Sequence, residues 1–142
     1  MDGEHAHEPM RAYGIQETFE SIQRELNRIL NTRRPFLRNF TFENRLSAID
    51  YGIPDFSHVD PASPTDRQEL ESLLVRSIES FEPRLIDVRV QLEEHPANRR
   101  ALLGYLYANV FIHMASEPVC FPLELSMNGG HSKIHSPSEN RP

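Results

Sequence analysis

Residues 82–85, Glu82-Pro83-Arg84-Leu85, place a carboxylate and a guanidinium on either side of a rigid proline. Two such charges can pair with each other and stiffen a turn, or they can stay exposed and bind charged groups of a partner. The two roles are compatible, and the sequence leaves both open. We take Glu82, Pro83, Arg84 and Leu85 as candidate partner-binding residues.

Carboxylates near this turn raise the alternative of a glycan hydrolase. Such an enzyme needs two carboxyl groups about 5 to 10 Å apart, one of which holds its proton until it donates it. Glu82 with Asp87 or Glu93 can be named, but no spacing rule selects them. The neighbouring Arg84 favours the ionised form of Glu82, which does not suit a general acid. With no Trp to stack on sugar, the sequence predicts no catalytic residue.

Histidines offer a second possible chemistry. His131 and His135 have the four-residue spacing of helical zinc ligands, but Gly129, Gly130 and Pro137 argue against a helix there. The N-terminal histidines, His5 and His7, have no nearby Cys and no convincing carboxylate shell for a structural zinc site. The sequence contains no glycine-rich phosphate loop and no nucleophile elbow. We therefore expect no metal and no cofactor.

A basic and aromatic segment begins at Arg33 and Arg34 and continues through Phe36, Arg38 and Phe40. This pattern is typical of single-stranded nucleic-acid binding, but it also fits a solvated loop whose phenylalanines enter the core. The net charge of -6 and the pI near 5.6 oppose phosphate binding. We expect no nucleic acid, and we take Arg33 and Arg34 as candidate contacts to carboxylates of a protein partner.

Two amphipathic helices are indicated by apolar residues that recur every three or four positions. The first spans about residues 16–31. The second begins at a capping box formed by Thr65 and Gln68 and ends before Pro83, because a proline cannot continue a helix.

The connection between these helices is rich in proline. Residues 32–44 have neither the helical nor the strand period, which predicts an ordered loop. Residues 46–51 are expected to form a short helical segment that Gly52 and Pro54 stop.

Three strands are predicted after the second helix. The first has an apolar residue at every second position, namely Ile86, Val88, Val90 and Leu92. The second and third are the apolar runs 102–112 and 119–127. Pro122 cannot donate to a ladder, so the third strand is expected at an edge of the sheet.

The predicted fold is α+β: two main helices and a short helical segment packed on a mostly antiparallel three-stranded sheet. The 142 residues fit a flexible N-terminal tail (1–13), a single domain (14–127) and a flexible C-terminal tail (128–142). The chain has no apolar run of about 18 residues and a polar start, so we expect no membrane insertion and a cytoplasmic location.

Three short motifs lie at the boundaries of these elements: residues 31–34 (Asn-Thr-Arg-Arg), residues 51–56 (Tyr-Gly-Ile-Pro-Asp-Phe) and residues 82–85. In this order and at these separations they resemble the TssE family of type VI secretion baseplate subunits. The related phage baseplate wedge proteins, once labelled tail-lysozyme-like, share the resemblance. It covers about residues 16–127.

The resemblance implies a structural role in a contractile injection machine, without a small-molecule substrate. The Glu-Pro-Arg turn would dock on the wedge subunits TssF, TssG and TssK. The sheet edge would pair with the sheath subunits TssB and TssC, so that the chain links wedge to sheath and initiates sheath assembly. It would act in the cytoplasm, on the membrane-docked baseplate.

Two alternatives remain open from the residues. The tail-lysozyme-like label invites a peptidoglycan-degrading hydrolase. A small regulatory adaptor is also compatible, because one fold can host unrelated binding functions. A sheet edge with unpaired backbone groups suits both a baseplate subunit and a regulatory adaptor, since another chain can add a strand to it.

Overall fold

The computed structural model describes residues 3–34 and 51–137, with the backbone alone for residues 3–13 and Arg34. In chain order the elements are α1 (Gly3–Leu30), β1 (Arg33–Arg34), β2 (Ile53–Pro54), α2 (Pro64–Phe81), β3 (Leu85–Glu94), β4 (Ala101–Ile112), β5 (Ala115–Ser126) and β6 (Lys133–Ile134). An antiparallel sheet has the order β3-β4-β5-β6, and β1 pairs with β2 in parallel. The α+β class is confirmed, but the sheet has four strands where three were predicted.

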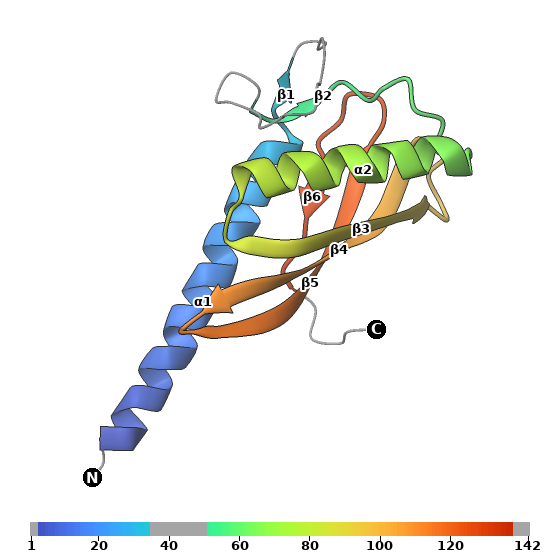
Figure 1. Ribbon diagram of the computed structural model, residues 1–142. Helices are drawn as coiled ribbons and strands as arrows, with labels where there is room; N and C mark the ends of the chain where they lie inside the picture. The colour runs from blue at the N-terminus through green and yellow to red at the C-terminus, as the bar shows by residue number, and fades with distance from the viewer. Residues whose placement is uncertain (1–2, 35–50, 138–142) are drawn as a thin grey trace.

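The two helices cover one face of the sheet (Figure 1). Their apolar stripes, Ile22, Leu26, Ile29 and Leu30 from α1 and Leu70, Leu74 and Ile78 from α2, join the inward residues of β3, β4 and β5 in one buried cluster. Burial of this area is the main favourable contribution to folding. The N-terminal part of α1 runs past the end of the sheet (Figure 1).

Helix α1 begins at Gly3, well before the expected start near residue 16. The apolar stripe marks only the part of the helix that packs on the sheet. Residues 3–13 include Ala, Glu, Met and Arg, which have high helix propensity, and also Pro9, which disfavours a helix interior. The helix therefore extends into the segment that was expected to be a tail.

The capping box predicted at Thr65 is wrong by two residues. The N-cap of α2 is Ser63, whose Oγ accepts a hydrogen bond from the backbone N–H of Asp66 (3.2 Å). Pro64 takes the first helical position, where its fixed φ suits the helix and its missing N–H has no partner to lose. The predicted end of the helix before Pro83 is confirmed, because α2 ends at Phe81.

The predicted alternation along β3 is broken by a bulge. The pairing of β3 with β4 shifts between Ile86 and Arg89, and Asp87 has a left-handed φ of 55°. A bulge inserts one extra residue and exchanges the faces of the residues before it. Leu85 is therefore buried and Ile86 is 42% exposed, whereas Val88 onward keeps the predicted inward phase.

Strand β6 lies in the segment expected to be a C-terminal tail, and side chains of α1 hold it in place. Asn27 Oδ1 accepts from the N–H of Ile134 (2.8 Å) and its Nδ2 donates to the carbonyl of Ile134 (3.2 Å). Asn31 makes the same exchange with Ser132 (2.9 Å each way). Gln23 adds a bond to Ile134 (3.1 Å). This amide ladder, defined by Gln23, Asn27 and Asn31, satisfies the outer backbone groups of β6 as a further strand would.

Pro122 is not at the outermost strand, because β6 lies beside β5. The carbonyl of Pro122 nevertheless accepts a hydrogen bond from the backbone N–H of His135 (2.8 Å). The nitrogen of Pro122 therefore also faces β6 and points away from β4. Pro122 thus removes no hydrogen bond between β5 and β4. Beyond the two paired residues of β6, the part of β5 from Ala115 to Phe121 has no other strand at its outer side among the described residues.

We predict that Asn27→Ala lowers the free energy of unfolding by about 2 kcal/mol, because both backbone groups of buried Ile134 lose a partner. Chemical denaturation measures the change. Gln16→Ala is the matched control: it removes an exposed amide of the same helix that bonds only Glu20 (3.4 Å), and a change within about 0.5 kcal/mol is expected. Equal effects of the two substitutions would contradict the role of the ladder.

Candidate functional site

The corner between α2 and β3 is built on the carboxylate of Glu82. Glu82 is the C-cap of α2, and its N–H donates to the carbonyl of Ile78 (2.8 Å). Its Oε2 accepts from the backbone N–H (3.0 Å) and Nε (2.8 Å) of Arg84, and its Oε1 accepts from Nη2 (2.7 Å). The Glu82 side chain is 1% exposed, whereas that of Arg84 is 42% exposed. The two charges therefore pair as a fork across Pro83.

Arg84 also ties the corner to α1. Its Nη1 donates to Ser21 Oγ (2.9 Å). The hydrogen bonds to Glu82 raise the pKa of Arg84, against the opposing effect of partial burial. The structure thus supports the local, stiffening role of the Glu-Pro-Arg turn. The docking role stays a prediction, and the exposed part of Arg84 is the surface available for it.

Arg33, a candidate partner contact, is used mainly inside the molecule. Its Nη1 donates to the carbonyl of Leu30 at the end of α1 (2.6 Å), and its guanidinium lies 4.4 Å from the ring centroid of Phe56. Burial lowers the pKa of Arg33, and the nearby carboxylate of Asp55 opposes the shift. For Arg34 only the backbone course in β1 is described. A docking role of either arginine stays a prediction.

Two of the three motifs, residues 31–34 and 51–56, pair directly with each other. Arg33 and Arg34 form β1 where a loop was expected, and they lie in register with Ile53 and Pro54 of β2. Gly52 makes this approach possible: its φ is +98°, and a Cβ there would lie 2.1 Å from the carbonyl oxygen of Thr32. The rest of the predicted loop and most of the short helical segment, residues 35–50, lie outside the described residues.

Tyr51 connects these motifs to the corner. Its hydroxyl hydrogen-bonds to the carboxylate of Glu25 on α1, and its ring meets Phe81 edge-on (5.0 Å, 61°), next to Glu82. Burial and the bond to Glu25 raise the pKa of Tyr51. Glu25 also pairs with Arg28 (3.1 Å). The three motifs, far apart in sequence, therefore surround the C-terminal half of α1.

Sequence reasoning missed Ser21 and Glu25, the two side chains of α1 that join the motifs. They lie four residues apart on the flank of the apolar stripe, where polar residues are usual on any surface helix. Nothing in their type distinguishes them from solvated positions. Only the approach of Arg84 and Tyr51 to this flank gives them a role.

The model of the family described as baseplate wedge protein gp25 matches residues 16–118, which include all three motifs. The chain belongs to the baseplate wedge gp25 family. This confirms the resemblance indicated by the motifs. A comparison with curated proteins finds no match.

Two solved structures resemble this gp25-family chain. One is a chain of the baseplate complex from the type VI secretion system, with 20% identity and a TM-score of 0.54, over 80% of this chain and 98% of that chain. It shares the fold. The other, from Geobacter sulfurreducens, is described as a tail lysozyme and has 20% identity and a TM-score of 0.49, over 77% and 92% of the two chains.

In this gp25-family fold, two of the described carboxylates are engaged in hydrogen bonds within the chain. Glu82 is buried and held by the Arg84 fork. A hollow of about 460 Å³ between α2 and β3 is lined by Glu71 and Glu79, and Glu71 Oε2 accepts a hydrogen bond from the N–H of Leu92 (2.8 Å). Asp87 and Glu93, the other carboxylates considered for hydrolysis, are exposed on β3.

Two further observations on the described residues concern metal ligands and membrane-spanning helices. No group of three or more His, Cys, Asp or Glu side chains there could hold a metal ion. His131 and His135 flank the extended strand β6, so they do not have the helical geometry of zinc ligands. No helix of the described residues is long and apolar enough to cross a membrane.

We predict that Arg84→Ala lowers the free energy of unfolding by roughly 2 to 3 kcal/mol, because the Glu82 carboxylate stays buried without its counter-ion. The loss is smaller than for a fully buried pair because the outer part of Arg84 is in water. The double variant Glu82→Gln/Arg84→Ala should recover part of it, since no charge is then buried. Denaturation curves of the two variants test this, and a double variant no more stable than Arg84→Ala would contradict it.

Proposed function

We propose that this chain is a structural subunit of a type VI secretion baseplate that joins the wedge to the contractile sheath and initiates sheath assembly. The observation that carries the proposal is the gp25 family match over residues 16–118. The three motifs within this span converge on α1 in a rigid cluster. A rigid corner with one partly exposed arginine suits a scaffold, because little freedom is lost when a partner binds it.

We assign the wedge contact to Arg84, at the corner between α2 and β3, and to the neighbouring side chains Glu25 and Arg28 of α1. Arg84 and Arg28 have side chains 42% and 64% exposed, and the carboxylate of Glu25 lies beside both. Guanidinium groups held in fixed positions bind partner carboxylates with defined geometry. The partners proposed for this surface are TssF, TssG and TssK.

The sheath contact is assigned to the outer edge of β5. Along a strand, alternate residues direct their backbone groups to opposite neighbours, so Ser116, Pro118 and Cys120 share the outward direction of Pro122. Pro118 cannot donate, which leaves the carbonyls of Ser116 and Pro118 and the N–H of Ser116 for a short added strand from TssB or TssC. The edge of β3 is less available, because Glu71 of α2 bonds the N–H of Leu92.

We predict that Arg84→Ala weakens binding to a purified TssF–TssG–TssK complex about tenfold or more, because the charged contact at the corner is lost. Binding is measured by biolayer interferometry, at a temperature where denaturation curves show the variant folded. Loss of binding should be accompanied by loss of sheath polymers in cells.

Two controls separate docking from stability. Asn27→Ala is destabilised to a similar degree at the opposite side of α1 and should bind the wedge complex normally. Arg99→Ala removes an exposed arginine from the turn between β3 and β4 and should also bind normally. Wedge binding by Arg84→Ala equal to that of Asn27→Ala would remove the corner from the docking surface.

We predict that Ser116→Pro spares wedge binding and reduces sheath initiation, because the outward N–H of β5 is removed. Ser116→Ala keeps this N–H and should behave as the parent chain. Sheath growth is followed by electron microscopy of TssB–TssC polymers on reconstituted baseplates. Unchanged sheath growth with Ser116→Pro would show that this edge does not accept a strand.

A further inference from the structure

The face of the sheet opposite the helices has an apolar end. Register places Ile86 of β3, Asn109 of β4 and Pro118 of β5 in one row across the sheet, and Phe111 on the same face in the next row. Ile86 is 42% exposed and Phe111 is 60% exposed. Neither residue contributes to the buried cluster, so their exposure carries a cost in water that folding does not require.

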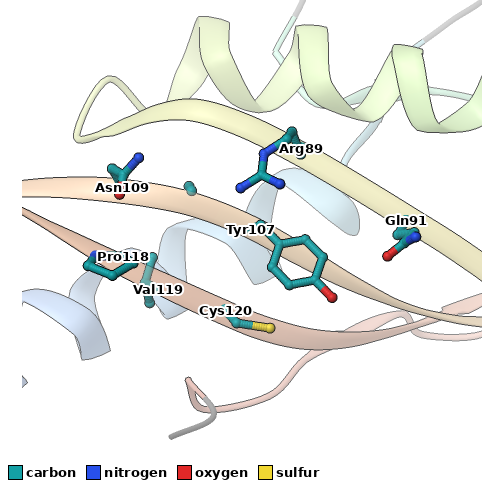
Figure 2. Close-up of a pocket in the computed structure, with 8 residues that line it drawn as sticks. Arg89, Gln91, Tyr107, Asn109, Pro118, Val119 and Cys120 are labelled. Atoms are coloured by element: carbon teal, nitrogen blue, oxygen red, sulfur yellow. The ribbon is translucent and has the colours of Figure 1, made fainter. Parts of the chain in front are cut away.

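Next to this apolar end lies a hollow whose lining includes the positively charged side chain of Arg89. It has a volume of about 470 Å³ and is lined by side chains that include Arg89, Tyr107, Pro118 and Cys120. Figure 2 shows Arg89 reaching from β3 toward the ring of Tyr107 on β4, with Pro118 and Cys120 on β5 beyond. The Arg89 guanidinium lies 5.4 Å from the centroid of the Tyr107 ring.

Arg89 is an exposed cation, and no carboxylate in the described part of the chain serves as its counter-ion. Among the described carboxylates, none forms an ion pair with it, although the whole chain carries a net charge of -6. Glu93 and Glu124 lie in one row further along the same face, across from Leu103. In the row of Ile86 and Pro118, Asn109 Nδ2 also donates to the carboxylate of Asp87 (3.5 Å). Along the strands the face thus has exposed apolar side chains, then the cation of Arg89, then the acidic pair, and an apolar side chain next to a carboxylate complements the first two of these.

The hairpin that presents the apolar end is strained. His113 and Met114 have φ of 52° and 65°, a turn that favours Asn-Gly, and Met114 is 86% exposed. A left-handed Met costs free energy that a glycine would not. Strain at an exposed apolar tip is a feature of sites that bind, where a flexible thioether adapts to a partner surface.

We infer that this outer face, defined by Ile86, Arg89, Tyr107, Phe111 and Pro118, binds an extended segment of another protein in which a large apolar side chain lies within a few residues of a carboxylate. The apolar side chain packs on Phe111, Ile86 and Pro118. The carboxylate pairs with Arg89 over the ring of Tyr107. This surface is formed by side chains on the face of the sheet and differs from the corner of Arg84 and from the backbone groups at the outer edge of β5, although Pro118 belongs to that edge strand. The inference does not depend on the function proposed for the corner or the edge.

The test uses the full chain and a phage-displayed library of random twelve-residue peptides as the probe. We expect enriched peptides to share a Leu, Phe, Ile or Trp with an Asp or Glu within about four residues on either side of it. A synthetic peptide of the enriched sequence is then measured by fluorescence anisotropy. Failure to enrich any peptide, or enrichment without the acidic residue, overturns the inference.

Variants locate the binding site and distinguish other occupants. Arg89→Glu and Phe111→Ser should each lower the affinity for the peptide about tenfold or more. A peptide with Lys in place of its acidic residue should bind Arg89→Glu more tightly than it binds the parent chain. Arg99→Glu, an exposed charge reversal in the β3–β4 turn, and Arg84→Ala at the corner should leave the affinity unchanged. If sedimentation shows that the chain self-associates and that Phe111→Ser abolishes this, the occupant is a second copy and the inference is wrong.

Discussion

The burial of one carboxylate determines how the two halves of this molecule join. Glu82 ends α2 in a position 1% exposed to solvent, where an unpaired charge would be costly. The backbone and side chain of Arg84 supply three of its hydrogen bonds, and they can do so only if the chain reverses across Pro83. The direction in which β3 leaves α2, and hence the placement of the sheet under the helix, follows from this pairing.

Helix α1 supports the rest of the fold with three different sides. Its apolar stripe packs in the core, its amide ladder replaces a strand beside β6, and its polar flank at Ser21 and Glu25 receives the corner and Tyr51. Each side binds a segment that is distant in sequence. The motifs therefore act through α1, which explains how short boundary sequences can define a shared structure.

The sequence predicted what depends on apolar period and on proline. Both helices, the end of α2 before Pro83 and the three long strands follow from these signals. It did not predict β6, because two residues are too few for a period and the bonds that hold them come from α1. The bulge at Asp87 and the parallel pair β1–β2 were missed for the same reason: a left-handed residue and the close approach at Gly52 are set by tertiary contacts.

The candidate site was predicted in its residues but only partly in their roles. Glu82 and Arg84 are together at a boundary, as their spacing implied, yet most of their hydrogen-bonding capacity is used within the chain. What remains for other proteins is the outer part of Arg84, the outward side of β5 and the uncovered face of the sheet. The outward prolines 118 and 122 limit how far a strand can extend along β5, so a partner that pairs there is confined to a short segment near the hairpin. The apolar end of the uncovered face lies at this same hairpin. One end of the sheet thus brings together the outward side of β5 at Ser116, the exposed apolar side chains and the corner.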